Sequence, residues 1–85
     1  MKNQRYIKEL AEHFLKIKTR REVIAFLDGI LSPQELVDIS QRLQIVKQLK
    51  RGVSQREIAT DLGVGIATVT RGSRELQKGK FKNVN

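Results

Sequence analysis

The residues best suited to chemistry lie between positions 66 and 74, where small, hydroxyl-bearing and basic side chains interrupt an apolar pattern. Small side chains let a backbone approach a surface closely, and hydroxyl and guanidinium groups bond to phosphates and base edges. The side chains of this kind are Ala67, Thr68, Thr70, Arg71, Ser73 and Arg74. Their spacing places them on one helix beside an apolar stripe, which predicts a helix that contacts the groove of a nucleic acid.

Two helices joined by a tight turn must position these side chains, and the stretch 54–76 has the signals for both. Ser54 is a good N-cap, and Glu57, three residues later, completes a capping box. Gly63 ends the first helix in a left-handed conformation, and Gly65 opens the second. The apolar stripes are Ile58, Ala59 and Leu62 in the first helix, then Ile66, Val69 and Leu76 in the second, with Val64 at the corner. The pattern predicts a DNA-binding helix-turn-helix, and the plainer alternative is a helical hairpin in a core.

Two amphipathic helices are expected before this stretch, over residues 3–18 and 19–31. Thr19 and Glu22 form a capping box for the second of them. Its apolar side chains are dense and cover more than one face: Val23, Ile24, Phe26, Leu27, Ile30 and Leu31. In a chain this short, such a broad stripe favours burial against a second copy of the chain, and therefore a homodimer.

The longest helix is expected over residues 32–51. Ser32 as N-cap, Pro33 at the first helical position and Glu35 at the third agree on its start, and Gly52 follows as its cap. Lys50, on its polar face, is predicted to contact phosphates of any sequence. The chain is thus predicted to be one domain over 1–85, with a helical dimerisation core (1–52), a reading head (54–76) and a basic, flexible tail (77–85).

The composition favours a polyanionic partner. The chain of 85 residues has 17 Lys and Arg against 9 Asp and Glu, a net charge of +8. The absence of cysteine excludes disulfides and thiolate metal sites. No apolar run is long enough for a membrane span, and the N-terminus is too polar for a secretory signal. We therefore expect a cytoplasmic protein without a membrane partner.

Signatures of an enzyme are missing from the sequence. His13 is the only histidine, has no partner nucleophile and lies outside any metal-ligand spacing. The segment Gly63-Val64-Gly65 superficially resembles a phosphate loop, but it lacks the preceding strand and the further glycines of a dinucleotide site. We expect no catalytic residues, no metal and no bound cofactor.

At residues 31–76 the sequence resembles the tryptophan repressor family. The segments that carry the resemblance are LSPQEL, QRLQIVKQLKRG and SQREIATDLGVGIATVTRGS. The resemblance implies an all-α fold with a C-terminal helix-turn-helix, an intertwined homodimer and a double-stranded operator as partner. Two such reading heads enter successive major grooves about 34 Å apart.

The resemblance also implies which side chains face the DNA. The groove-facing residues are Gln55, Arg56, Ile66, Ala67 and Thr70, and the chemistry of Ser73 and Arg74 adds them to the residues predicted to contact DNA. Gly65 lets the helix N-terminus approach a phosphate. Arg56 is the predicted guanine contact, because a guanidinium bonds N7 and O6 together.

In the family, the indole of L-tryptophan lies between two arginines, and Arg42 and Arg71 match those positions. Gly72 matches the glycine that leaves room for the ring. Glu75 stands where the tryptophan-binding members have a serine that contacts the ligand amine. Its carboxylate either pairs with the ligand ammonium or pairs with Arg71, four residues earlier on the same helix.

Two function classes remain open from the sequence. The first is a sequence-specific transcriptional regulator, a repressor that uses L-tryptophan or a related amino acid as corepressor, or a ligand-independent regulator of the same family. The second is a helical protein-interaction module. Salt dependence separates them, because only binding through several phosphates weakens steeply as salt rises.

Overall fold

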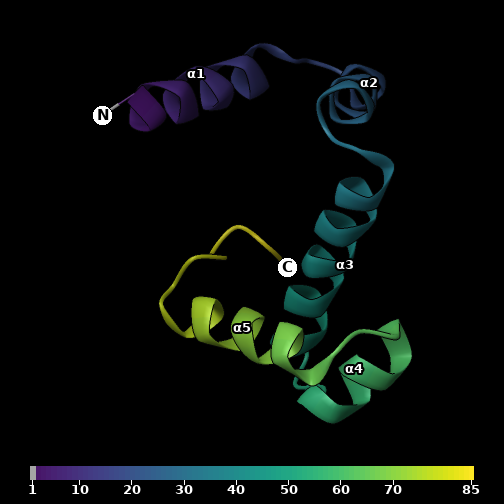
Figure 1. Ribbon diagram of the computed structural model, residues 1–85. Coiled ribbons are helices and arrows are strands. Elements are labelled where there is room, and N and C mark those ends of the chain that lie inside the picture. The colour runs from purple at the N-terminus through teal and green to yellow at the C-terminus, as the bar shows by residue number, and fades with distance from the viewer. Residues whose placement is uncertain (1) are drawn as a thin grey trace. The chain divides into compact units, whose positions relative to one another are not determined.

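A computed structural model describes residues 2–85, and these residues form five helices and no strand (Figure 1). The all-α prediction is confirmed. The helices are α1 (Lys2–Lys16), α2 (Arg20–Ile30), α3 (Pro33–Lys50), α4 (Gln55–Leu62) and α5 (Ile66–Gln77). Met1, the first residue of the predicted domain, lies outside the described residues. The chain divides into two compact units, one up to Leu36 and the other Val37–Asn85.

The helices α2, α3 and α4 begin where the sequence predicts, because side chains bond to the backbone N–H groups that the first turn leaves without partners. At α2, Thr19 Oγ1 accepts from the N–H of Glu22 at 3.1 Å. At α3 the capping box is reciprocal. The N–H of Ser32 donates to Glu35 Oε1 at 2.8 Å, and the N–H of Glu35 donates to Ser32 Oγ at 3.1 Å.

The N-terminal unit contains α1 and α2, and neither helix has a fully buried residue. Aromatic rings make the contact between them: Phe14 meets Phe26 edge to face, with ring centroids 5.3 Å apart, and His13 lies against the same ring. Several large apolar side chains are more than half exposed, namely Tyr6, Ile7, Leu15, Ile24 and Ile30. One copy of the chain therefore leaves much of this apolar surface in contact with water.

The C-terminal unit has a core of its own, built from α3, α4 and α5. Ile45, Val46, Ile58 and Val69 are at most 3% exposed. Partly buried side chains pack around this core: Leu49, Val53, Ala59, Leu62 and Val64. Ala59 packs here as part of the predicted apolar stripe, and Val64 packs from the predicted corner between α4 and α5. Burial of each large side chain contributes roughly 1.5–3 kcal/mol, so this small core holds the three helices together.

Two glycines in the left-handed conformation make the turns on either side of α4. Gly63, with φ 65°, ends α4, and its N–H donates to the carbonyls of α4's last turn. Gly52, with φ 84°, follows α3, and its N–H donates to Leu49 O at 3.0 Å. Ser54 then caps α4 and accepts from the N–H of Glu57 at 3.2 Å.

The division into units differs from the predicted one. It falls after Leu36, inside α3, and not after residue 52. The reason is packing: Ile45 and Val46 in the second half of α3 are buried, and Ile45 clusters with Ile58 and Val69 of the head. The greater part of α3 thus packs in the same unit as the reading head.

The C-terminal segment, which the sequence predicts to be a flexible tail, makes backbone turns in the structure. It turns at Gly79, with φ 82°, and folds back from the end of α5 towards α3 (Figure 1). The ammonium of Lys50 donates to the backbone carbonyls of Phe81 and Val84. In the structure Lys50 therefore holds the tail, and its contact with phosphates stays a prediction.

Candidate nucleic-acid interface and ligand pocket

The N-terminus of α5 is open to solvent. Gly65 caps the helix without a side-chain hydrogen bond, and Gly65, Ile66, Ala67 and Thr68 are exposed. The first N–H groups of a helix have no intrahelical acceptor, and the helix dipole is positive at this end. Three exposed residues with small or short side chains and a free helix end form a surface that a phosphate can approach closely.

A hydrogen bond joins two predicted DNA-facing residues across α4 and α5. Thr70 Oγ1 donates to Gln55 Oε1 at 2.8 Å and lies 3.0 Å from the carbonyl of Ile66, so its single hydrogen serves one acceptor at a time. Gln55 accepts this bond through Oε1, so the N–H groups on its Nε2 are not used in it. Thr70 thereby fixes the orientation of the Gln55 amide at the start of α4.

The other predicted DNA-facing residues differ in exposure. Arg56 and Arg74 are exposed, whereas Ser73 is half-buried. Ile66 is 52% exposed and does not contribute to the apolar stripe that the sequence assigned to it. Val69, also in the predicted stripe and one turn later, is fully buried, whereas Ile66 is on the outer surface of the head.

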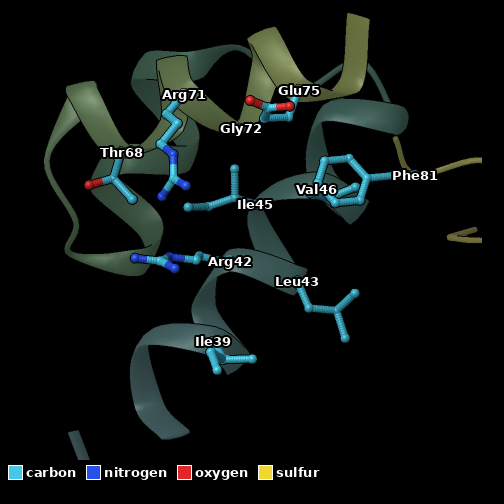
Figure 2. Close-up of a pocket in the computed structure, with 10 residues that line it drawn as sticks. All are labelled: Ile39, Arg42, Leu43, Ile45, Val46, Thr68, Arg71, Gly72, Glu75 and Phe81. Carbon is cyan, nitrogen blue, oxygen red and sulfur yellow. The ribbon is translucent and has the colours of Figure 1, made fainter. Parts of the chain in front are cut away.

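A pocket of about 300 Å³ opens between α3 and α5, and it brings all four predicted ligand residues together. Figure 2 shows Arg42 and Arg71 on one side of Ile45, with Phe81 beside Val46 on the other side. The complete lining is Ile39, Arg42, Leu43, Ile45, Val46, Thr68, Arg71, Gly72, Glu75 and Phe81. Sequence reasoning missed Phe81, although it is the only aromatic residue after Phe26.

Gly72 has a packing role at the floor of this pocket. A Cβ atom at this position would lie 3.0 Å from Ile45 Cγ2 and 3.8 Å from a methyl carbon of Leu49. The glycine therefore lets α5 approach α3 closely. Any larger side chain would push the helices apart or extend into the pocket.

The carboxylate of Glu75 is on the pocket wall, and its ionic partner is Lys78. The Lys78 Nζ to Glu75 Oε1 distance is 3.5 Å, and the Glu75 side chain is 33% exposed. Within residues 2–85, Glu75 and Arg71 form no ion pair. The guanidinium of Arg71 therefore stays available to a ligand in the pocket. If Glu75 bound a ligand instead of Lys78, it would lose only a long, solvent-screened ion pair.

Two further properties bear on function. Among the described residues, no cluster of three or more His, Cys, Asp or Glu side chains is arranged to hold a metal ion. None of the helices in this part of the chain is both long and apolar enough to cross a membrane.

A comparison with known proteins finds a matching family and similar relatives. Residues 5–83 match the family described as Trp repressor protein. A Trp operon repressor homolog of Vibrio vulnificus (strain YJ016) is 40% identical over 72 residues, covering 84% of this chain and 68% of the relative. The homolog of Xylella fastidiosa (strain M23) is 31% identical over 84 residues, which are 98% of this chain and 91% of that protein. No solved structure gives a significant match.

The five helices and these matches define a small all-helical regulator that binds DNA and is not an enzyme. The chain belongs to the Trp repressor family.

Proposed function

We propose that this chain is a transcriptional repressor that binds an operator as a homodimer and uses L-tryptophan or a related amino acid as corepressor. The observation that carries the proposal is the contrast between the buried side and the exposed side of α5. Val69 on its inner side is fully buried, whereas its N-terminus and its outer side present Ile66, Ala67 and Arg74 to solvent.

In this proposal the first turns of α4 and α5 enter the major groove together. Arg56 bonds a guanine through N7 and O6, and Gln55, oriented by Thr70, donates to a neighbouring base. Gly65 and Ala67 allow close approach of the helix end to a phosphate. Arg74, with Ser73 beside it, supplies a phosphate contact that positions the head without reading sequence.

The homodimer is supported by the apolar surface of the N-terminal unit. Side chains such as Ile24 and Ile30 are more than half exposed in one copy, and an equivalent surface on a second copy would cover them. A dimer of this kind places two reading heads about 34 Å apart, which matches one turn of the operator.

The corepressor proposal is supported by the chemistry of the pocket. Its lining is mostly apolar, with two guanidinium groups and one carboxylate, which suits a ring that carries a carboxylate and an ammonium. Arg71 would meet the ligand carboxylate, and Glu75 would leave Lys78 for the ammonium. A ligand between α3 and α5 and an operator on α5 would favour the same position of the head, so each would strengthen binding of the other.

A matched pair of arginine variants tests the DNA-reading head. Each of Arg56→Ala and Arg74→Ala removes one positive charge. Binding is measured against a library of operator sequences over a range of salt concentrations. Arg56→Ala should relax base preference at one position, at a cost of about 1–3 kcal/mol, whereas Arg74→Ala should weaken all sequences alike. Identical behaviour of the two variants would contradict the assignment of Arg56 to a base.

A titration with L-tryptophan tests the corepressor. The sequence contains no tryptophan, so ligand fluorescence has little protein background. Saturable binding that is lost in Arg71→Ala, and absent with a non-aromatic amino acid, is the expected result. No binding at millimolar ligand would leave a ligand-independent regulator. Operator binding that is insensitive to salt would instead favour the protein-interaction module.

A further inference from the structure

The C-terminal segment, residues 78–84, forms a compact hook that returns from the end of α5 to α3 (Figure 1). Gly79, with φ 82°, allows the reversal, and its N–H donates to Leu76 O at 3.0 Å. A further turn joins the N–H of Val84 to Phe81 O at 3.1 Å. These bonds give the hook a defined path.

The hook is attached to the last turns of α3. The ammonium of Lys50, the last residue of α3, donates to the backbone carbonyls of Phe81 and Val84. Val46 lies four residues before Lys50, so the two side chains are on the same side of the helix. Figure 2 shows the ring of Phe81 beside Val46. One side of α3 thus offers the hook both an apolar side chain and an ammonium group.

Nearer its N-terminus, α5 is attached to α3 by packing. Val69 is fully buried and clusters with Ile45. At Gly72 the two helices approach so closely that a Cβ would lie 3.0 Å from Ile45 Cγ2. A pocket of about 300 Å³ lies between the two helices, and Phe81 of the hook is part of its lining. The hook therefore supplies a second attachment to α3, beyond the C-terminal end of α5.

Two attachments along a helix fix the direction in which it points, whereas a single one makes tilting easier. With its 12 residues, α5 is about 18 Å long. Ile66 and Ala67, which are exposed at its N-terminus, are predicted to contact DNA. A small tilt about Val69 would move them relative to the bases. Contacts to base edges depend on distance and angle, so such a tilt would weaken them.

We propose that the hook, anchored by Lys50, fixes the direction of α5 for sequence-specific binding of DNA. Lys50 is then a positioning residue, which acts through the hook and not through a phosphate. The inference rests on the proposed function in one respect, that α5 reads the operator, and it holds with or without a corepressor. Release of the hook should lower selectivity among DNA sequences more than affinity for DNA in general, because the attraction between the basic chain and phosphates remains.

Two substitutions in the full-length chain release the hook in different ways. Lys50→Met keeps the stem of the side chain and loses the ammonium that donates to both carbonyls. Gly79→Val leaves the net charge unchanged and places a β-branched side chain at φ 82°, a conformation that such residues rarely adopt. Lys80→Met is the control, because it removes the same charge from an exposed lysine of the hook.

Binding is measured to two duplexes of equal length, one that the wild type enriches from a random library and one with the same bases in scrambled order. Millimolar L-tryptophan is present throughout, so that a requirement for corepressor affects all variants alike. Lys50→Met and Gly79→Val should each weaken binding to the enriched duplex about tenfold, comparable to the loss of one base contact. With the scrambled duplex, Gly79→Val should bind like the wild type and Lys50→Met like Lys80→Met. A loss of folded protein would weaken both duplexes alike, so the ratio of the two affinities reports the direction of α5.

The double variant with Lys50→Met and Gly79→Val separates the hook from a direct phosphate contact. If both substitutions act by releasing the hook, the double variant should bind the enriched duplex about as well as either single variant. If Lys50 instead contacts phosphates, its loss should weaken both duplexes alike and add fully to the effect of Gly79→Val. That result would overturn the inference.

Trypsin reports on the hook without DNA. It cleaves after lysine, and Lys82 is exposed within the hook. Because cleavage requires the segment to open, cleavage after Lys82 should be several-fold faster in Lys50→Met and in Gly79→Val than in Lys80→Met. Equal rates in all three variants would show that Lys50 does not hold the hook, and its positioning role would be wrong.

The outcomes distinguish this inference from the proposal beneath it. If the wild type enriches no sequence from the library, the proposed reading of an operator and the role of the hook fall together. If the wild type is selective and the two released variants keep the same ratio of affinities, only the role of the hook is overturned.

Discussion

The two units of the chain differ in how far they bury their own apolar side chains. In the C-terminal unit, Ile45, Ile58 and Val69 are fully buried within one copy of the chain. In the N-terminal unit neither helix buries a residue, although both carry strong apolar stripes. The part proposed to read DNA has a core of its own, whereas the N-terminal part exposes the apolar surface that a second copy is proposed to cover.

The largest expected effect is a loss of stability from a substitution in the core of the C-terminal unit. Ile58→Ala should lower the free energy of unfolding by about 2–5 kcal/mol, because it removes buried methyl and methylene groups and leaves a cavity. Ile66→Ala is the matched control, since Ile66 is 52% exposed in the same unit, and its effect should be below about 1 kcal/mol. Urea unfolding followed by circular dichroism measures both. Equal losses would mean that Ile58 is not the centre of this core.

A second prediction concerns the uncovered surface of the N-terminal unit. Ile24→Glu should raise the dimer dissociation constant about a hundredfold or more, because a carboxylate would lie in an apolar interface without a partner. Ile66→Glu makes the same change at a similarly exposed isoleucine of the head, and it should leave the dimer intact. Analytical ultracentrifugation over a range of concentrations separates the two. A dimer that tolerates Ile24→Glu would place the interface elsewhere.

The local features of the fold were predictable from the sequence. The caps at Thr19, Ser32 and Ser54 and the left-handed turn at Gly63 depend on residues close together in the chain, so short patterns specify them. The presence of the predicted ligand residues in one pocket followed from the family resemblance, because Arg42 and Arg71 lie far apart in sequence.

The features that sequence reasoning missed depend on contacts between distant segments. Lys50 resembles any other cation on a polar helix face, and only the folded chain brings the carbonyl of Phe81 to it, 31 residues later. The boundary between the units inside α3 is of the same kind. A helical stripe shows which side of α3 is apolar, but not which part of the chain covers it.

Two glycine variants sharpen the comparison between the units. Gly72→Ala gains about 1 kcal/mol in helix propensity but must displace Ile45 Cγ2, 3.0 Å from the new Cβ, at a cost of about 1–3 kcal/mol. The net effect should be destabilising by about 1 kcal/mol. At Gly29 in α2 nothing lies within 4 Å of a new Cβ, so Gly29→Ala should stabilise by up to about 1 kcal/mol.

Thermal unfolding of both glycine variants at one protein concentration checks the opposite signs. Destabilisation by Gly29→Ala would indicate that a second copy packs closely against α2 at this residue. Stabilisation by Gly72→Ala would show that Ile45 moves aside easily and that α5 does not need a glycine where it meets α3.

The smallest expected effects come from two equivalent caps. Ser54→Ala and Thr19→Ala each remove one side-chain acceptor, for the N–H of Glu57 or of Glu22, at a cost of about 1 kcal/mol. Because α4 packs on the core of its own chain, the loss at Ser54 should be the same at every protein concentration. The loss at Thr19 should shrink at high concentration if a second copy holds α2 in place, since association then stabilises the folded helix. Amide hydrogen exchange in the first turn of each helix, measured at two concentrations, reports both losses. Concentration dependence at Ser54 as well would mean that the head also depends on the second copy.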